Sequence, residues 1–404
     1  MSYGLLGEHL SHSYSPRIHK ELGDYAYRLY EVAPEELEAF LQEGDFRGLN
    51  VTIPYKKAVM PYCTELSETA RAMGCVNTIL RRQDGTLYGH NTDCGGFSFL
   101  LERMGGAIPG AKALVLGTGG AAGTVTQVLR RGGMEVVQIS RGGEENYSNY
   151  DRHRDAKLLV NATPVGMYPN VGTAPVDPGK LPNLTAVLDL IYNPRRTQLL
   201  LDAQKLGIPC EDGLPMLVAQ AVEAAELFTG KEIPKDTIEK VLRKLRGEMG
   251  NLILIGMPGS GKSTVGKALA QRLGRTFVDS DAEIVKRIGS IPDYFSAYGE
   301  EAFRKVETEV LGELGKGSAM VIATGGGVVT REENYPLLHQ NGTIIRLHRD
   351  LALLPTEGRP LSQQQSLEDM FAKRDPLYRA FADIEINNSS TVEAAVEQIM
   401  EKCL

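Results

Sequence analysis

Residues 256–263 have the residue types and spacing of a phosphate-binding loop. They read GMPGSGKS, which matches GxxxxGK[ST], after the apolar run LILI and before the helical pattern TVGKALAQRLG. Glycines let backbone N–H groups surround a phosphate, and the start of the following helix adds a positive end. Lys262 can reach the terminal phosphates, and the Ser263 hydroxyl can ligate Mg²⁺. The pattern therefore predicts a nucleotide site. Its expected contacts are Gly259, Ser260, Gly261, Lys262, Ser263 and Thr264.

Two carboxylates, Asp279 and Asp281, follow at the end of the next apolar stretch. On an extended chain, side chains two residues apart project to the same side. One of them can then support a metal ion and the other can orient or deprotonate a hydroxyl nucleophile. We expect Asp279, together with Ser263, to hold the metal. The helical pattern AEIVKRIG comes directly afterwards, so a simple helix N-cap at Asp281 is the alternative.

Short hydroxyl, amide and ionisable side chains recur at the ends of apolar runs in the first part of the chain. They occur in HSYSP, NVTIPYKK, GCVNT and GHNTD. Hydroxyls and amides suit a polyhydroxylated acid, and Lys56 and Asp93 are available for proton transfer. Because Ser-Pro, Asn and Asp are also common in turns, ordinary turn chemistry is the alternative.

A second glycine motif, GTGGAA, begins at Gly117 after the apolar run ALVL. It matches GxGxxA at the start of a helical pattern, which is the setting of a dinucleotide site. The next apolar run, EVVQIS, leads to Ser140 and Arg141. An NAD site usually has Asp or Glu there, whereas Arg suits a 2′-phosphate, so NADP is favoured over NAD.

Parallel sheets with crossover helices must position these groups. The apolar runs ALVLG, EVVQIS, KLLVNAT and AVLDLIY alternate with helical stretches such as TVTQVLRRGG, which is typical of an α/β fold. A transition at GGAIPG and a charged segment ending near residues 247–250 divide the chain. We expect three regions, residues 1–104, 105–246 and 250–404.

Composition narrows the class of protein. The 404 residues carry a formal net charge of −7, which disfavours a nucleic-acid partner. No apolar run approaches the ~18 residues that a membrane span needs, and the first residues do not resemble a signal peptide, so we expect a cytoplasmic protein without a membrane partner. The five cysteines form no CxxC pair, so neither disulfides nor zinc is indicated. A homo-oligomer is compatible with the sequence.

Residues 1 to about 246 resemble shikimate dehydrogenase. The motifs SxSP, NVTIPYK, GCVNT, GxNTD, GxGGAA, NATPVGM, DLIYNP and GLPMLVAQA occur in that family's order. The resemblance implies an α/β substrate lobe, completed by helices around residues 213–246, and a Rossmann-type NADP-binding lobe. It implies that Lys56 and Asp93 form the catalytic pair. They would share the substrate site with Ser13, Ser15, Thr52, Asn77, Tyr192 and Gln220. The implied NADP contacts are Gly117, Thr118, Gly119, Gly120, Ala121, Ala122, Ser140, Arg141, Leu190 and Gly213.

Residues 250–404 resemble shikimate kinase. The P-loop, DxD, GExxFRxxE, GGG, RPL and RxPLY elements occur in order. The resemblance implies a P-loop α/β domain similar to the NMP kinases. Shikimate would be bound by Asp281, Arg304, Gly326 and Arg374. Asp281, Lys262 and the lid residue Arg359 would be catalytic, with Arg359 also contacting ATP.

Together the two resemblances predict a bifunctional enzyme. It would reduce 3-dehydroshikimate to shikimate with NADPH, and then phosphorylate shikimate with ATP and Mg²⁺. Two alternatives stay open at this point. One is a metabolite sensor without catalysis, and the other is a chain in which only one of the two parts is active.

Overall fold

The computed structural model describes residues 2–10, 13–354 and 366–403. Contacts divide the chain into two compact units. Unit 1 comprises Met1–Val165, Ala174–Tyr192 and Asp202–Leu242, and unit 2 comprises Gly166–Thr173, Asn193–Leu201 and Arg243–Leu404. Arg359, predicted as a lid residue, lies outside the described residues. No helix in the described ranges is long and apolar enough to cross a membrane.

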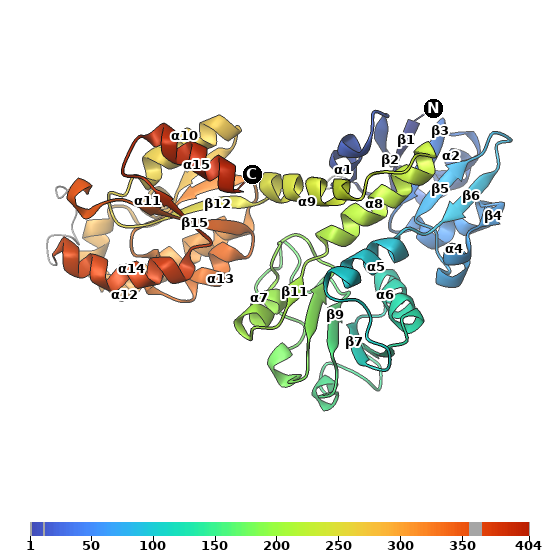
Figure 1. The fold of residues 1–404 in the computed structure, drawn as a ribbon, viewed down its shortest axis with the longest axis horizontal. Helices are drawn as coiled ribbons and strands as arrows, with labels where there is room; N and C mark the ends of the chain where they lie inside the picture. Colours follow the sequence, from blue (N-terminus) through green and yellow to red (C-terminus); the bar gives the residue numbers. More distant parts are fainter. Residues whose placement is uncertain (1, 11–12, 355–365, 404) are drawn as a thin grey trace. The chain divides into compact units, whose positions relative to one another are not determined.

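A mixed six-stranded sheet forms the first part of unit 1, in the order β2-β1-β3-β5-β6-β4 (Figure 1). Its strands are β1 (Ser2–Gly7), β2 (Tyr27–Glu31), β3 (Phe46–Val51), β4 (Glu65–Leu66), β5 (Thr78–Arg81) and β6 (Leu87–His90). The helices of this part are α1 (Ser15–Leu22), α2 (Leu37–Glu43), α3 (Tyr55–Ala58) and α4 (Glu68–Met73). β1 and β3 run parallel, so the segments that follow them leave the sheet at the same edge.

Helix α8 (Leu214–Thr229), far along the chain, packs against this N-terminal sheet. The ring of Phe228 on α8 stacks on Tyr3 of β1, with centroids 4.7 Å apart. At Gly48 in β3, an added Cβ would lie 2.6 Å from the Phe228 ring, so glycine allows this close approach. The packing carries Gln220 of α8 toward the N-terminal sheet.

A parallel five-stranded sheet forms the rest of unit 1, in the order β11-β10-β9-β7-β8. Its strands are β7 (Lys112–Leu116), β8 (Glu135–Ile139), β9 (Leu158–Asn161), β10 (Ala186–Asp189) and β11 (Cys210–Glu211). The four apolar runs predicted as strands are therefore confirmed. Apolar residues of α5 (Asp93–Arg103) and α6 (Gly120–Arg131) pack on the sheet in one buried cluster. Helix α7 (Gln198–Lys205) precedes β11.

Unit 2 is built on a second parallel sheet, in the order β13-β14-β12-β15-β16. Its strands are β12 (Asn251–Ile255), β13 (Thr276–Asp279), β14 (Met320–Ala323), β15 (Gly342–His348) and β16 (Ile384–Asn387). Its helices are α10 (Lys262–Leu273), α11 (Ser280–Ile288), α12 (Ile291–Lys316), α13 (Asn334–His339), α14 (Leu367–Phe381) and α15 (Val392–Cys403). Helix α9 (Asp236–Met249) precedes β12.

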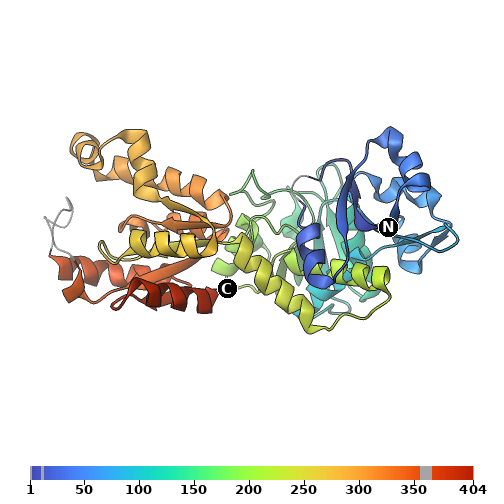
Figure 2. The same ribbon diagram turned by 90° about the horizontal axis from the view of Figure 1, so that it is seen from above.

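Both faces of the unit 2 sheet are covered by helices. Successive residues of β12 alternate between two buried clusters, with Leu252 and Leu254 in one and Ile253 and Ile255 in the other. The first cluster includes α10 and α15, which lie side by side (Figure 2). The second includes residues of α12, α13 and α14. This burial on both sides is why β12 reads as a continuous apolar run.

Candidate active sites

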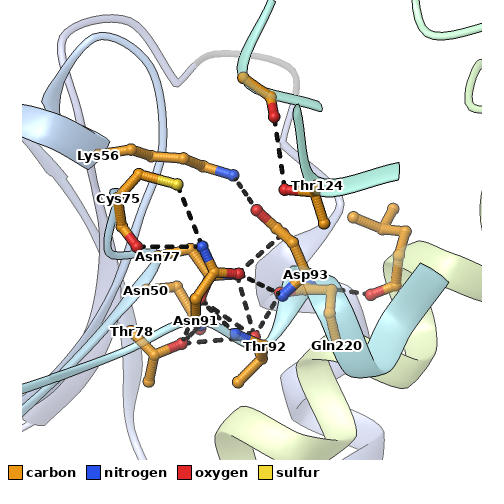
Figure 3. A network of polar contacts seen from close by, with 12 residues as sticks. Asn50, Lys56, Cys75, Asn77, Thr78, Asn91, Thr92, Asp93, Thr124 and Gln220 are labelled. Atoms are coloured by element: carbon orange, nitrogen blue, oxygen red, sulfur yellow. Dashed lines mark hydrogen bonds and ion pairs between the residues drawn. The ribbon is translucent and has the colours of Figure 1, made fainter. Parts of the chain in front are cut away.

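Lys56 and Asp93 form an ion pair in unit 1 (Figure 3). Lys56 lies on the short helix α3, and Asp93 is the first residue of α5. The Lys56 Nζ lies 2.5 Å from Asp93 Oδ2, and the two side chains are 30% and 16% exposed. A partly buried ammonium held by one carboxylate oxygen can exchange a proton with a bound ligand while keeping a fixed position.

The other oxygen of Asp93 is held by a buried amide. Asn77 Nδ2 donates to Asp93 Oδ1 over 2.8 Å, and Asn77 Oδ1 accepts from the backbone N–H of Thr92 over 2.7 Å (Figure 3). The Thr92 hydroxyl lies 3.4 Å from Gln220 Oε1 on α8. Four residues predicted for the substrate site, Lys56, Asn77, Asp93 and Gln220, are thus brought together by the helices α3, α5 and α8 and by the loop before β5.

Sequence reasoning missed the residues that support this network. Asn91 and Thr92 are fully buried, and Asn91 Oδ1 accepts from the backbone N–H of Asp93 over 3.0 Å. Asn91 Nδ2 donates to the carbonyl oxygen of Cys75 over 3.1 Å, which ties the GHNTD and GCVNT segments together. The signal was present in the sequence, since both residues belong to the motif that contains Asp93.

The remaining predicted substrate residues lie after β1, after β3 and after β10. The backbone N–H of Ser15 donates to Ser13 Oγ over 3.2 Å at the start of α1. Between the two serines, the Tyr14 ring meets the Tyr192 ring edge to face at 5.7 Å. Burial raises the pKa of the Tyr192 phenol, so the hydroxyl stays protonated. Thr52 directly follows β3, and its backbone N–H donates to the carbonyl of Leu6 over 2.9 Å.

The predicted dinucleotide loop lies at the point in the parallel sheet where the strand order reverses. β7 pairs with β8 on one side and β9 on the other, so the loops that follow β7 and β9 open at a topological switch point. Gly117 has φ of +105°, and an added Cβ there would lie 3.0 Å from Thr163 after β9. Around Gly119 and Gly120, at the start of α6, an added Cβ would meet no atom within 4 Å. This open helix start fits a pyrophosphate.

The other predicted NADP residues occupy both sides of this switch point. Ser140 and the exposed Arg141 follow β8, where a 2′-phosphate would be read. Leu190 and Gly213 adjoin each other, because a Cβ on Gly213 would lie 2.0 Å from the Leu190 carbonyl oxygen. Ala122 is fully buried and packs in the sheet cluster, so its side chain supports α6.

In unit 2 the phosphate loop borders a cavity of about 860 Å³. Lys262 Nζ donates to the carbonyl oxygens of Gly256 and Met257, over 2.9 and 3.0 Å. The Ser263 hydroxyl donates to Asp279 Oδ2 over 2.7 Å. The predicted metal residues are therefore adjacent. A hydroxyl and a single carboxylate are oxygen ligands that fit Mg²⁺ when it also binds nucleotide phosphates.

The two carboxylates are not arranged as the sequence suggested. Helix α11 begins at Ser280, so Asp279 and Asp281 do not share one extended segment. The N-cap is Asp279, whose Oδ1 accepts from the backbone N–H groups of Asp281 and Ala282, and the alternative of an N-cap at Asp281 is wrong. Asp281 instead lines the cavity from the first helical turn.

Asp281, Arg304, Gly326 and Arg374 all line the same cavity. Burial raises the pKa of Asp281, and the negative charge of Asp279 adds to this, while Lys262 and Arg304 act in the opposite direction. Arg374 Nη1 donates to the carbonyl oxygen of Gly326 over 3.1 Å. The predicted residues are thus assembled by the first turn of α11 and the segment after β14, together with α12 and α14.

Sequence reasoning also missed two residues that bond to the predicted ones in this region. The carboxylate of Glu307, 1% exposed, accepts from Arg304 Nη1 over 2.7 Å. The Tyr378 hydroxyl donates to the Gly326 carbonyl over 2.5 Å. Both residues belong to motifs whose arginines were selected, so their place in FRxxE and RxPLY was the available signal.

Comparison with known proteins finds a family match for the N-terminal part of the chain and another for the C-terminal part. The model "Shikimate dehydrogenase substrate binding domain" matches residues 5–79, and "Shikimate 5'-dehydrogenase C-terminal domain" matches residues 213–243. Shikimate dehydrogenase (NADP(+)) of Clostridium beijerinckii is 38% identical over 246 residues, which cover 56% of this chain and 91% of that protein. The chain belongs to the shikimate dehydrogenase family. The family's enzyme from Methanopyrus kandleri is 40% identical over 277 residues, covering 60% of this chain and 95% of that one.

Solved structures resemble the dehydrogenase part as well. The shikimate 5-dehydrogenase of Thermus thermophilus, in complex with NADP(H) and shikimate, has a TM-score of 0.55 and 33% identity over 60% of this chain and 98% of that one. A chorismate mutase/shikimate 5-dehydrogenase fusion from Clostridium acetobutylicum has a TM-score of 0.57 and 36% identity, covering 60% and 96%. The remaining part of the chain, residues 258–404, matches the "Shikimate kinase" family model.

Proposed function

We propose that this protein is a bifunctional enzyme of chorismate and aromatic amino acid biosynthesis. Its dehydrogenase part reduces 3-dehydroshikimate to shikimate with NADPH, and its kinase domain phosphorylates shikimate with ATP. The observation that carries this proposal is the presence of two separate sites, the Lys56–Asp93 pair and the Ser263–Asp279 pair beside Lys262, in a chain matched by both families.

In the first reaction, bound NADPH supplies the hydride that reduces the ring ketone. Lys56 donates the proton that converts the ketone oxygen to a hydroxyl, and Asp93 keeps the ammonium in place and stabilises its charge. The 2.5 Å contact between them supports these roles. The hydroxyls of Ser13 and Ser15 bind the substrate carboxylate. Thr52, Asn77, Tyr192 and Gln220 bind the ring.

In the second reaction, bound MgATP supplies the phosphoryl group. Asp281 accepts a hydrogen bond from the 3-hydroxyl of shikimate, orients its oxygen toward the phosphate, and takes up its proton as the new O–P bond forms and ADP leaves. Arg304 and Arg374 bind the shikimate carboxylate beside Gly326. Ser263 and Asp279 would hold Mg²⁺, and Lys262, which donates to its own loop carbonyls in this structure, would contact the phosphates. Arg359 acts as the lid cation.

We also propose the wider setting of the enzyme. Residues 1–104 and about 213–246 form the shikimate-binding lobe, 105–246 the NADP-binding lobe and 250–404 the kinase domain. The enzyme acts in the cytoplasm on small molecules, and neither nucleic acid nor membrane is a partner. Its net charge of −7 supports the first of these exclusions.

A single preparation of the full chain tests the function through two readouts. Shikimate-dependent reduction of NADP⁺ reports the dehydrogenase, and shikimate-dependent release of ADP reports the kinase. We expect Lys56→Ala to lower the first activity by about 10²-fold or more while leaving the second unchanged, and Lys262→Ala to do the reverse.

The outcomes separate the alternatives. If the unmodified protein bound shikimate but showed neither activity, it would be a metabolite sensor. If the unmodified protein showed only one of the two activities, it would be a chain with a single active part. Loss of both activities in either variant would contradict two independent sites.

A further inference from the structure

Arg349 is a cation in the kinase cavity to which neither the motifs nor the proposed function gives a role. It lines the cavity together with Lys262, Ser263 and Arg374. An arginine at this position can bind an anion, and both substrates of the proposed kinase reaction, shikimate and ATP, are anions.

Arg349 is also the cavity arginine without a partner in the described part of the chain. Its Nε is buried and has no hydrogen-bond acceptor there, and no ion pair of its guanidinium occurs among the described residues. By contrast, Arg304 pairs with Glu307 and Glu300, at 2.7 and 3.1 Å. A buried guanidinium N–H without an acceptor costs free energy, so the site favours a ligand that provides one.

The fold places Arg349 on the nucleotide side of the cavity. It follows β15, which pairs with β12 on the side opposite β14, whereas the Gly326 segment follows β14. The end of β15 is joined to the phosphate loop through Asn388. The Asn388 backbone N–H donates to the His348 carbonyl over 2.7 Å, and its Nδ2 donates to the Ser260 carbonyl over 2.7 Å.

The phosphate loop itself approaches the same strand end. An added Cβ on Gly256 would lie 2.6 Å from the carbonyl oxygen of Leu347, two residues before Arg349. The loop after β12 and the segment after β15 are therefore in contact at the carboxyl edge of the sheet. In a parallel α/β sheet, this edge is where phosphates bind.

We propose that Arg349 binds the polyphosphate of ATP. Its guanidinium donates charge-assisted hydrogen bonds to phosphate oxygens, alongside Lys262. The inference rests on the proposed kinase function, and it adds a nucleotide contact that the phosphate-loop motif does not contain. From residue 350 to residue 372 the sequence has a single basic residue, Arg359, so few other cations are available from this stretch.

The experiment compares Arg349→Gln and Arg349→Lys with Lys286→Gln in the full chain. Lys286 lies on α11 with a side chain 70% exposed, so its variant makes the same charge change away from the cavity. The readouts are KM for ATP, KM for shikimate, kcat, the Kd of a non-hydrolysable ATP analogue, and the dehydrogenase activity of the same sample as a check of the preparation.

We expect Arg349→Gln to lower kcat/KM for ATP by about 10- to 100-fold, to weaken analogue binding, and to leave KM for shikimate within twofold. Arg349→Lys should retain part of the affinity, and Lys286→Gln should match the unmodified protein. Unchanged analogue binding and kcat/KM for ATP would overturn the proposal, as would a change confined to KM for shikimate. If the unmodified chain released no ADP, the kinase function would fail, while analogue binding would still decide the role of Arg349.

Discussion

At the scale of single residues, the kinase cavity holds a carboxylate, Asp281, whose ionised form is less favourable in the folded protein than in the unfolded chain. Asp281 is largely buried near Asp279, and both its burial and this neighbour raise its pKa. A raised pKa in the folded state means that the ionised form is less favourable there than in the unfolded chain. Asp281 therefore lowers stability at neutral pH, where the role proposed for it requires the ionised form.

This conflict predicts that Asp281→Asn stabilises the kinase domain while inactivating it. We expect ADP release to fall at least about 10²-fold and the thermal midpoint to rise by about 2–4 °C at pH 7. The stability gain should shrink as the pH falls through the pKa of folded Asp281, because the native carboxyl then becomes protonated and neutral.

Calorimetry at several pH values measures this difference. Glu397→Gln is the matched control, since Glu397 is exposed on α15, and it should change the midpoint little. A lower midpoint for Asp281→Asn than for the native chain at pH 7 would contradict the interpretation.

At the scale of elements, the dehydrogenase site depends on how closely α5 and α8 approach. Asp93 begins α5, and Gln220 lies on α8. An added Cβ on Gly96 of α5 would lie 2.6 Å from the Met216 carbonyl oxygen and 2.9 Å from Gln220 Cβ. Glycine at this position therefore sets the spacing between the helices that carry Asp93 and Gln220.

We predict that Gly96→Ala separates the two helices. The overpacking should lower the free energy of unfolding of the dehydrogenase part by about 1–3 kcal/mol. It should also raise KM for shikimate in the dehydrogenase reaction. Denaturant unfolding and steady-state kinetics measure both effects. Gly312→Ala in α12 is the control, because its nearest neighbour atoms would be 3.8 Å away, and it should be neutral or stabilising. Equal behaviour of the two variants would show that the contact at Gly96 does not matter.

In the kinase domain, buried Arg346 joins β15, β16 and α14. It bonds to Glu385 of β16 over 2.6 Å and to Asp375 of α14, and its side chain is 2% exposed. Asp375 is the next residue after Arg374, which lines the cavity. The interaction thus fixes the helix that presents Arg374 to the cavity.

We expect Arg346→Met to destabilise the kinase domain by about 3 kcal/mol, because it leaves a partly buried carboxylate without its main partner. KM for shikimate in the kinase reaction should rise, while the dehydrogenase keeps its activity. Arg331→Met removes an arginine that pairs with the exposed Glu301 and Glu333, and it should be far less damaging. Comparable losses in both variants would argue against a special role of the buried position.

At the scale of the whole molecule, one metabolite must be recognised twice by different chemistry. Hydroxyls and amides surround the Lys56–Asp93 pair, whereas arginines line the kinase cavity. The described residues predicted for the first site all belong to unit 1, and those predicted for the second all belong to unit 2.

We therefore predict that shikimate equilibrates with solvent between the two reactions. With labelled 3-dehydroshikimate, NADPH and ATP, added unlabelled shikimate should dilute the label in shikimate 3-phosphate in proportion to its concentration. Mass spectrometry of the product measures this ratio. Label that passes undiluted into the product would show direct transfer.

The sequence by itself determined the fold class and the two families, and it predicted site residues that the structure brings together around the Lys56–Asp93 pair and around the unit 2 cavity. The glycines of the phosphate loop before Lys262 and of the dinucleotide loop that begins at Gly117 specify local backbone geometry that few other residues can adopt. Apolar runs specified the parallel strands for a similar reason, since burial on both faces requires continuous hydrophobic residues.

Only the tertiary structure decided how distant segments complete each site. The sequence could not show that α11 begins at Ser280 and makes Asp279 the N-cap, because an Asp at either position can cap a helix. It could not show that Asn91 and Thr92 support Asp93, that Glu307 pairs with Arg304, or that Arg349 has no acceptor among the described residues. Burial and hydrogen-bond partners depend on residues far apart in the chain, and these meet only when the sheets and helices pack.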